Sequence, residues 1–148
     1  MLDLDFEIHH AAEYPILSWR DLNEVQLRYD CFLGDVRFVL SGVNFSTDWG
    51  WIPIFDFALS FRLIGEALVR ESSAVFEFTD SDHVIEFNVQ DERVVVRTNY
   101  AIGQGVVKLS ECSRATAALL SRVRTRIEGE FPDLRENVHY RTALGQFW

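Results

Sequence analysis

Two runs of strand-like segments, separated by one long apolar stretch, constrain the fold of this chain more than any other feature. Residues 2–9 alternate strictly between apolar and polar side chains, which is typical of a strand with one buried face. Further strands are predicted on both sides of the apolar stretch, at residues 24–32, 36–40, 75–79, 84–89, 93–100 and 106–109. Because these strands come in runs and do not alternate with helices, the pattern predicts an antiparallel sheet and argues against a parallel nucleotide-binding one.

The apolar stretch predicts a helix over residues 54–71. One stripe at spacings of three and four holds Ile54, Phe57, Ala58, Phe61, Gly65 and Leu68, and a second holds Phe55, Leu59 and Leu63. A helix with two apolar stripes needs cover on two sides, from the sheet and from either another helix or a second subunit. We prefer cover from within the chain. Asp56 in this helix is expected to be exposed, because the helix dipole favours a carboxylate in the first turn.

The remaining segments complete a single domain. A helix is predicted over residues 113–131 and ends at Pro132, and the tail 133–148 has enough apolar residues for a short docked helix. The segment Leu33-Gly34-Asp35 is interpreted as a hairpin turn. We therefore expect one α+β domain over residues 1–148, with an antiparallel sheet of six or seven strands, a long central helix, and C-terminal helices packed on one face.

The first two thirds of the chain are strongly acidic. Residues 1–92 carry eighteen acidic side chains against five basic ones, whereas residues 93–148 carry five against nine. Such a field disfavours nucleic acid and anionic membranes as partners, and it favours a basic protein surface or a cation. The arginines of the helix at 113–131 are expected to pair with the acidic part of the chain.

A cytoplasmic location is expected. No basic segment followed by an apolar one opens the chain, so a secretory signal is not predicted. The most apolar stretch, residues 49–69, is interrupted by Asp56, Arg62 and Glu66, which makes it a core helix and not a membrane span. Cys31 and Cys112 lack CxxC spacing, so we interpret them as reduced and buried.

No motif fixes a reaction, a metal or a cofactor. Gly103-Gln104-Gly105 lacks the further glycine and the lysine of a phosphate-binding loop, and is interpreted as a turn. Asp80-Ser81-Asp82-His83 resembles the start of a calcium loop but lacks the next ligand and the glycine, so a solvated turn is preferred. No catalytic triad is recognisable. The chain is accordingly expected to be non-catalytic, without excluding an enzyme.

Asp48-Trp49-Gly50-Trp51 is the segment with the strongest signal for binding. Tryptophan is enriched in the residues that dominate interface energies, and a glycine-containing loop would expose this pair. The competing interpretation is that the two rings pack the long helix onto the sheet. With the acidic turn included, the candidate binding residues are Asp48, Trp49, Trp51, Asp80 and Asp82.

Four segments resemble a family of uncharacterised small bacterial proteins: Ala12-Glu13-Tyr14-Pro15, Leu17-Ser18-Trp19, Leu27-Arg28-Tyr29-Asp30-Cys31-Phe32 and Asp48-Trp49-Gly50-Trp51-Ile52-Pro53. The resemblance extends over most of the chain, but it implies no activity and no functional residue. In size, acidity and helix-on-sheet architecture the chain also resembles the immunity proteins of bacterial toxin systems, a likeness of general type.

Three functions remain open from the sequence. The leading hypothesis is an immunity-like cytoplasmic protein that presents an acidic and aromatic surface to a basic protein partner. The second is a small-molecule binder or enzyme with a pocket between sheet and long helix, which would use Arg28, Asp30 and Arg97. The third is a homodimeric structural domain that covers the second stripe of the long helix with another copy, so the chain could be a monomer or a homodimer.

Overall fold

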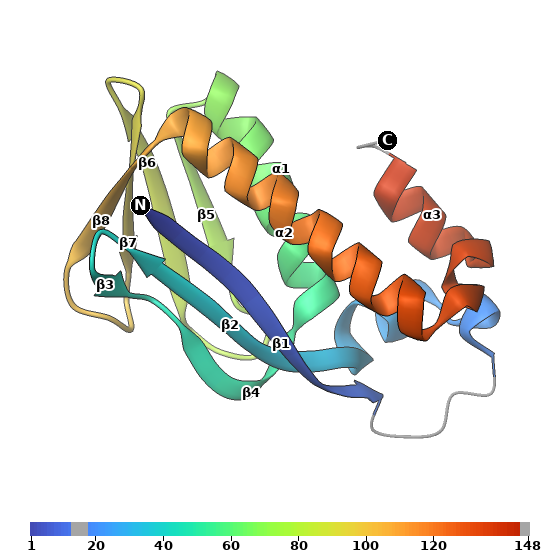
Figure 1. Cartoon of the computed structure of the whole chain (residues 1–148). Coiled ribbons are helices and arrows are strands. Elements are labelled where there is room, and N and C mark those ends of the chain that lie inside the picture. The colour runs from blue at the N-terminus through green and yellow to red at the C-terminus, as the bar shows by residue number, and fades with distance from the viewer. Residues whose placement is uncertain (13–17, 146–148) are drawn as a thin grey trace.

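The computed structural model describes residues 1–12 and 18–145, and Figure 1 shows them as strands on one side of a helical layer. The fold is α+β, as predicted, with antiparallel pairing throughout the two sheets of the described residues. The strands divide between two four-stranded sheets. The helix between β4 and β5 separates the two groups along the chain.

The first sheet is built around β2. Its strands are β1 (Leu2–Ala12), β2 (Cys31–Leu40), β3 (Val43–Asn44) and β4 (Thr47–Pro53). β1 pairs with β2 along its length, while β3 and β4 pair with successive parts of the other edge of β2. Leu4 and Phe38 are partners on the buried face, so the neighbouring partners Asp5 and Arg37 point to the opposite face, which we call the outer face.

The second sheet is a meander of sequential hairpins. Its strands are β5 (Ser73–Glu77), β6 (Val84–Gln90), β7 (Arg93–Thr98) and β8 (Gln104–Lys108). The two sheets meet where β2 ends, because the Ser41 hydroxyl donates to the Val106 carbonyl of β8 at 2.8 Å. Leu40 also packs against Gly105, where any side chain would collide with it.

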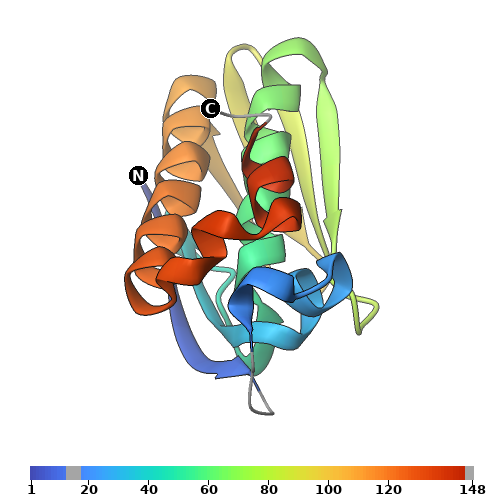
Figure 2. The ribbon, with the colours of Figure 1, turned by 90° about the vertical axis from the view of Figure 1, so that its right-hand side faces the viewer.

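The helices lie together on one side of the strands, as Figure 2 shows. They are α1 (Ile54–Arg70), α2 (Leu109–Glu130) and α3 (Val138–Gly145), with a 3₁₀ turn, η3 (Pro132–Glu136), after α2. The predicted stop at Pro132 is confirmed, although α2 begins four residues earlier than the apolar pattern indicates. A further 3₁₀ turn, η1 (Trp19–Asp21), packs near η3.

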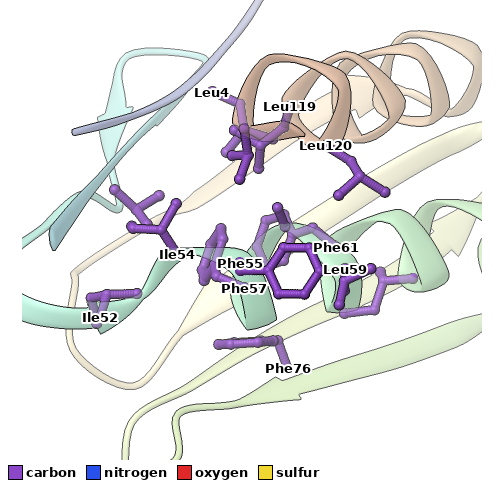
Figure 3. Packing of buried hydrophobic residues seen from close by; sticks show 14 of the residues in the cluster. Leu4, Ile52, Ile54, Phe55, Phe57, Leu59, Phe61, Phe76, Leu119 and Leu120 are labelled. Carbon is purple, nitrogen blue, oxygen red and sulfur yellow. The ribbon is translucent and has the colours of Figure 1, made fainter. Parts of the chain in front are cut away.

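The core lies between α1, α2 and the sheets (Figure 3). Phe57 and Phe61 of α1 stack with ring centroids 4.1 Å apart, and Phe76 of β5 meets Phe57 edge-on at 5.0 Å. The second stripe of α1 is covered in part: Phe55 contacts Tyr140 of α3, with ring centroids 5.3 Å apart, whereas Leu63 is 42% exposed. The preferred interpretation, that this chain covers both faces of its long helix, is confirmed for that stripe's buried residues Phe55 and Leu59.

The strand predicted over residues 24–32 is wrong in its first part. Residues 24–30 are helical and include a π-helical turn, η2 (Gln26–Asp30). The Asn23 side chain accepts a hydrogen bond from the Gln26 amide at 2.8 Å, and the Gln26 side chain accepts one from the Asn23 amide at 3.2 Å. This reciprocal capping box starts a helix.

The hairpin turn predicted at Leu33-Gly34-Asp35 is also wrong, since β2 runs straight through it. Gly34 serves close approach between strands: a Cβ there would lie 1.8 Å from the Glu7 carbonyl oxygen of β1. Likewise, Trp49-Gly50-Trp51 belongs to strand β4 and not to a loop, with Gly50 at a positive φ of 80° that bends the strand.

Candidate binding surface

An acidic depression with a volume of about 350 Å³ opens on the outer face of the first sheet. It draws its charged lining from three strands: Asp5 and Glu7 from β1, Asp35 and Arg37 from β2, and Asp48 from β4. Four carboxylates and one guanidinium give this small volume a formal charge of −3. The term acidic depression refers below to this hollow and its five charged side chains.

Three members of the acidic depression, Asp5, Asp35 and Arg37, have charged partners. Asp35 accepts a hydrogen bond from the Gly50 amide at 2.7 Å and pairs with His9 Nε2 at 2.7 Å. The hydrogen bond to Asp35 raises the pKa of His9, which favours the charged imidazolium. Arg37 forms an ion pair with Asp3, in which its Nε donates to Oδ2 at 2.5 Å. The single cation of the depression is therefore already paired.

Glu7 and Asp48 are different. Both are exposed, and the side chain of neither makes a hydrogen bond or ion pair with any residue that the structure describes. Within residues 1–12 and 18–145, no group of three or more His, Cys, Asp or Glu side chains is arranged to hold a metal ion. Carboxylate groups without partners are acceptors for the N–H donors of a guanidinium or ammonium group.

An aromatic cluster begins at Trp49, the residue that follows Asp48 along β4. Trp49 and Trp51 of β4 stack with ring centroids 5.3 Å apart, and Trp49 also contacts His83 at 4.7 Å and Tyr100 at 5.4 Å. Both tryptophans are half-buried and pack against the edge of the core. The Tyr100 hydroxyl donates to the Phe45 carbonyl at 2.8 Å, which fixes that ring.

The predicted binding residues gather around this cluster. Asp48 lines the acidic depression, and Trp49 and Trp51 follow it along β4. Asp80 and Asp82 are exposed in the turn between β5 and β6, directly before His83, the residue that Trp49 contacts. The turn is stabilised by the Asn99 side chain, which donates to the Asp82 carbonyl at 2.7 Å. The two tryptophans thus combine core packing with a partly exposed surface.

Sequence reasoning missed Asp5, Glu7 and Asp35 as candidates. The alternation in residues 2–9 predicts one polar face on β1, and that signal identifies Asp5 and Glu7 as neighbours on it. Asp35 was assigned to a turn, so nothing in the predicted fold brought it beside them. Pairing of the arginine-rich helix with acidic residues is confirmed at one point, where Arg122 Nε lies 3.6 Å from Asp5 Oδ1.

The expectation that Asp56 is exposed is wrong. It is 8% exposed and receives Arg28 Nη2 at 2.6 Å. Burial raises the pKa of this carboxyl group, and Arg28 opposes that effect by stabilising the charge. Arg28 is therefore engaged at the start of α1, whereas Arg97 donates to Gln104 on the second sheet and Asp30 is exposed. These three residues do not converge on a pocket between sheet and long helix.

Among the described residues, no helix is both long and apolar enough to cross a membrane. Comparisons with protein-family models, with curated proteins and with solved structures gave no match to this chain.

Proposed function

We propose that this chain is a non-catalytic, immunity-like binding protein that docks a basic protein partner on the acidic depression and the neighbouring tryptophans. The observation that carries the proposal is the concentration of four carboxylates in about 350 Å³, with Glu7 and Asp48 unpaired within the described residues. A lysine or arginine side chain of the partner would satisfy both carboxylates by charge-assisted hydrogen bonds.

The surroundings of the depression support a protein as the partner. The net charge of −9 would steer a basic protein toward this surface and raise the association rate. Trp49 and Trp51 would add apolar contact area next to the charged site, and tryptophan truncations at interface centres commonly cost 2 kcal/mol or more, on the order of a thirtyfold loss in affinity. Charge would thus set the association rate of the complex, and the two tryptophans would slow its dissociation.

A cytoplasmic location is part of the proposal. Cys31 and Cys112 are free and buried, and burial raises the pKa of each thiol to about 11. Buried thiols with such pKa values are unreactive, and unpaired cysteines are usual in reducing compartments.

The test is affinity capture from native cell lysate with three forms of the protein. The first is the wild type and the second is the double variant Glu7→Gln/Asp48→Asn. The third, Glu71→Gln/Asp133→Asn, makes the same change in charge and residue type at exposed positions outside the depression. We expect a basic protein to bind the wild type and the control, to be lost with the Glu7/Asp48 variant, and to dissociate at high salt.

The same experiment has outcomes that would overturn the proposal. Equal loss with both double variants would mean that only net charge matters and that the depression is not a site. Retention of the captured protein by the Glu7/Asp48 variant would place its contact surface elsewhere. Circular dichroism of all three forms separates these outcomes from misfolding.

A further inference from the structure

A second cavity, with a volume of about 510 Å³, lies where the C-terminal part of α2 meets η3 and α3. Its charged lining consists of Arg124, Glu128, Arg135 and Arg141, and Tyr140 and Leu144 form part of its wall. Three guanidinium groups face one carboxylate, so the cavity has a formal charge of +2. We call it the arginine cavity. It is a cationic site in a protein whose net charge is −9.

Glu128, the carboxylate of the arginine cavity, holds two of its arginines in place by hydrogen bonds. Glu128 is 7% exposed, and its Oε2 accepts from Arg124 Nε at 2.5 Å and from the Tyr140 hydroxyl at 2.7 Å. Its Oε1 accepts from Arg135 Nε at 3.0 Å. Both arginines are therefore anchored through Nε, and each guanidinium plane is fixed by a buried charge. Such anchoring reduces the entropy lost when a ligand is bound.

The first turn of α3, next to the cavity, is also held in place by hydrogen bonds. Asn137 is fully buried, and its amide nitrogen donates to the carbonyl groups of Trp19 and Leu22, each at 3.0 Å. Its side-chain oxygen accepts from the backbone amides of His139 and Tyr140 and so caps α3. The helix that contributes Tyr140 and the third arginine is thus held to the body of the protein at its first turn.

Arg141 supplies the charge that the internal network does not use. It projects from α3, is exposed, and its side chain makes no hydrogen bond or ion pair with a residue that the structure describes. Arg135 is also exposed beyond the Nε that bonds Glu128, with 66% of its side chain accessible. Hydrogen-bond donors on planar guanidinium groups match the oxygens of phosphate and carboxylate groups, and of the two only a phosphate monoester carries more than one negative charge.

We propose that the arginine cavity binds a phosphate monoester. A phosphate monoester carries close to two negative charges near neutral pH, which matches the formal charge of the cavity. The volume exceeds the space that a phosphate group needs, so a small organic portion can lie against Leu144. This site uses other residues and other elements than the acidic depression, and the inference is independent of the proposed docking of a basic protein.

Glucose 6-phosphate is the probe for this site, titrated by NMR at constant ionic strength, with glucose as the uncharged comparison. We expect saturable shifts at the amides of Arg135, Tyr140 and Arg141, and none with glucose. Arg141→Gln should weaken binding about tenfold, the effect of losing one charge-assisted contact. Arg114→Gln, an equal change of charge at an exposed position of α2 outside the cavity, should leave the affinity unchanged.

A parallel titration with a phosphoserine peptide distinguishes the source of the phosphate. Tighter binding of the peptide would identify a phosphorylated protein as the natural source, and tighter binding of glucose 6-phosphate would identify a small metabolite. Absence of saturable shifts would overturn the proposal, as would equal weakening by Arg141→Gln and Arg114→Gln. Because the Arg141 side chain has no partner among the described residues, its substitution leaves the fold intact, which thermal unfolding would verify.

Discussion

At the scale of single residues, Glu128 shows how a buried charge holds three elements together. Its carboxylate receives donors from α2, η3 and α3 at once. Burial raises the pKa of Glu128, but hydrogen bonds from Tyr140, Arg124 and Arg135 outweigh burial, and the net effect lowers the pKa. The charge is therefore stabilised in the folded state, and each donor contributes to the free energy of unfolding.

Removal of the Tyr140 hydroxyl tests this contribution. We expect Tyr140→Phe to lower the free energy of unfolding by about 2 kcal/mol, because the hydroxyl donates to a charged and buried acceptor. Tyr100→Phe is the matched control, since its hydroxyl donates to a neutral carbonyl, and it should cost about 1 kcal/mol. Urea unfolding of both variants measures the difference. Equal losses of unfolding free energy in the two variants would show that the charge of Glu128 does not strengthen its hydrogen bond with Tyr140.

The lowered pKa of Glu128 also predicts a pH dependence. The folded protein binds this proton less tightly than the unfolded chain, where the pKa is about 4.5. The stabilisation is therefore complete above that pH and is lost as the pH falls through the lower, folded-state pKa. We expect the stability gap between wild type and Glu128→Gln to shrink on acidification, as measured by urea midpoints between neutral and acidic pH. A gap that stayed constant would contradict the assignment.

At the scale of elements, the contact between α1 and α2 depends on one glycine. A Cβ on Gly65 would lie 2.1 Å from Thr116 Oγ1, a separation that no relaxed structure allows. We expect Gly65→Ala to destabilise the protein by about 1–3 kcal/mol through overpacking, despite the better helix propensity of alanine. The loss should shrink when Thr116→Ala removes the hydroxyl, and a double-mutant cycle in urea measures that coupling.

Gly129 provides the control for this prediction. It lies in α2 with no atom within 4 Å of its would-be Cβ, so Gly129→Ala should stabilise the protein by about 0.5–1 kcal/mol. If Gly65→Ala proved as harmless as Gly129→Ala, the two helices would not pack as closely as the structure describes.

Periodicity predicted most elements because most of them have one buried face. Both long helices and the four strands of the second sheet follow from spacing alone. The predictions failed where a local hydrogen bond or a close contact between strands determines the structure. Asn23 and Gln26 cap each other, and the strand-like segment that follows is helical. Gly34 was interpreted as a turn residue, whereas the approach of β1 requires it. Such effects depend on a partner strand or a reciprocal cap, which spacing does not reveal.

The candidate site was predictable only in part for the same reason. Asp48, Trp49 and Trp51 stood out by residue type, and the structure places them beside the turn that holds Asp80 and Asp82. Asp35 and Glu7 join Asp48 only through the register of β1, β2 and β4, which the sequence alone does not specify.

At the scale of the whole molecule, the uneven charge of the sequence is reflected in two hollows of opposite formal charge. The acidic part contributes the depression on the first sheet, and the basic C-terminal part contributes the arginine cavity between α2, η3 and α3. Some of the basic charge is used internally, as Arg122 donates to the Leu4 carbonyl beside Asp5. Both proposals rest on charged side chains that have no hydrogen bond or ion pair among the described residues: Glu7 and Asp48 in the acidic depression, and Arg141 in the arginine cavity.

By our proposal, the acidic depression is the preferred docking place for a basic protein segment. An NMR titration with a hexa-arginine amide, at low and at high salt, tests it most directly. We expect shifts concentrated at the amides of Glu7, Asp35 and Asp48 and at the indole signals of Trp49 and Trp51. These shifts should be lost at high salt and in Glu7→Gln/Asp48→Asn. Shifts spread evenly over all acidic residues of the chain would contradict it.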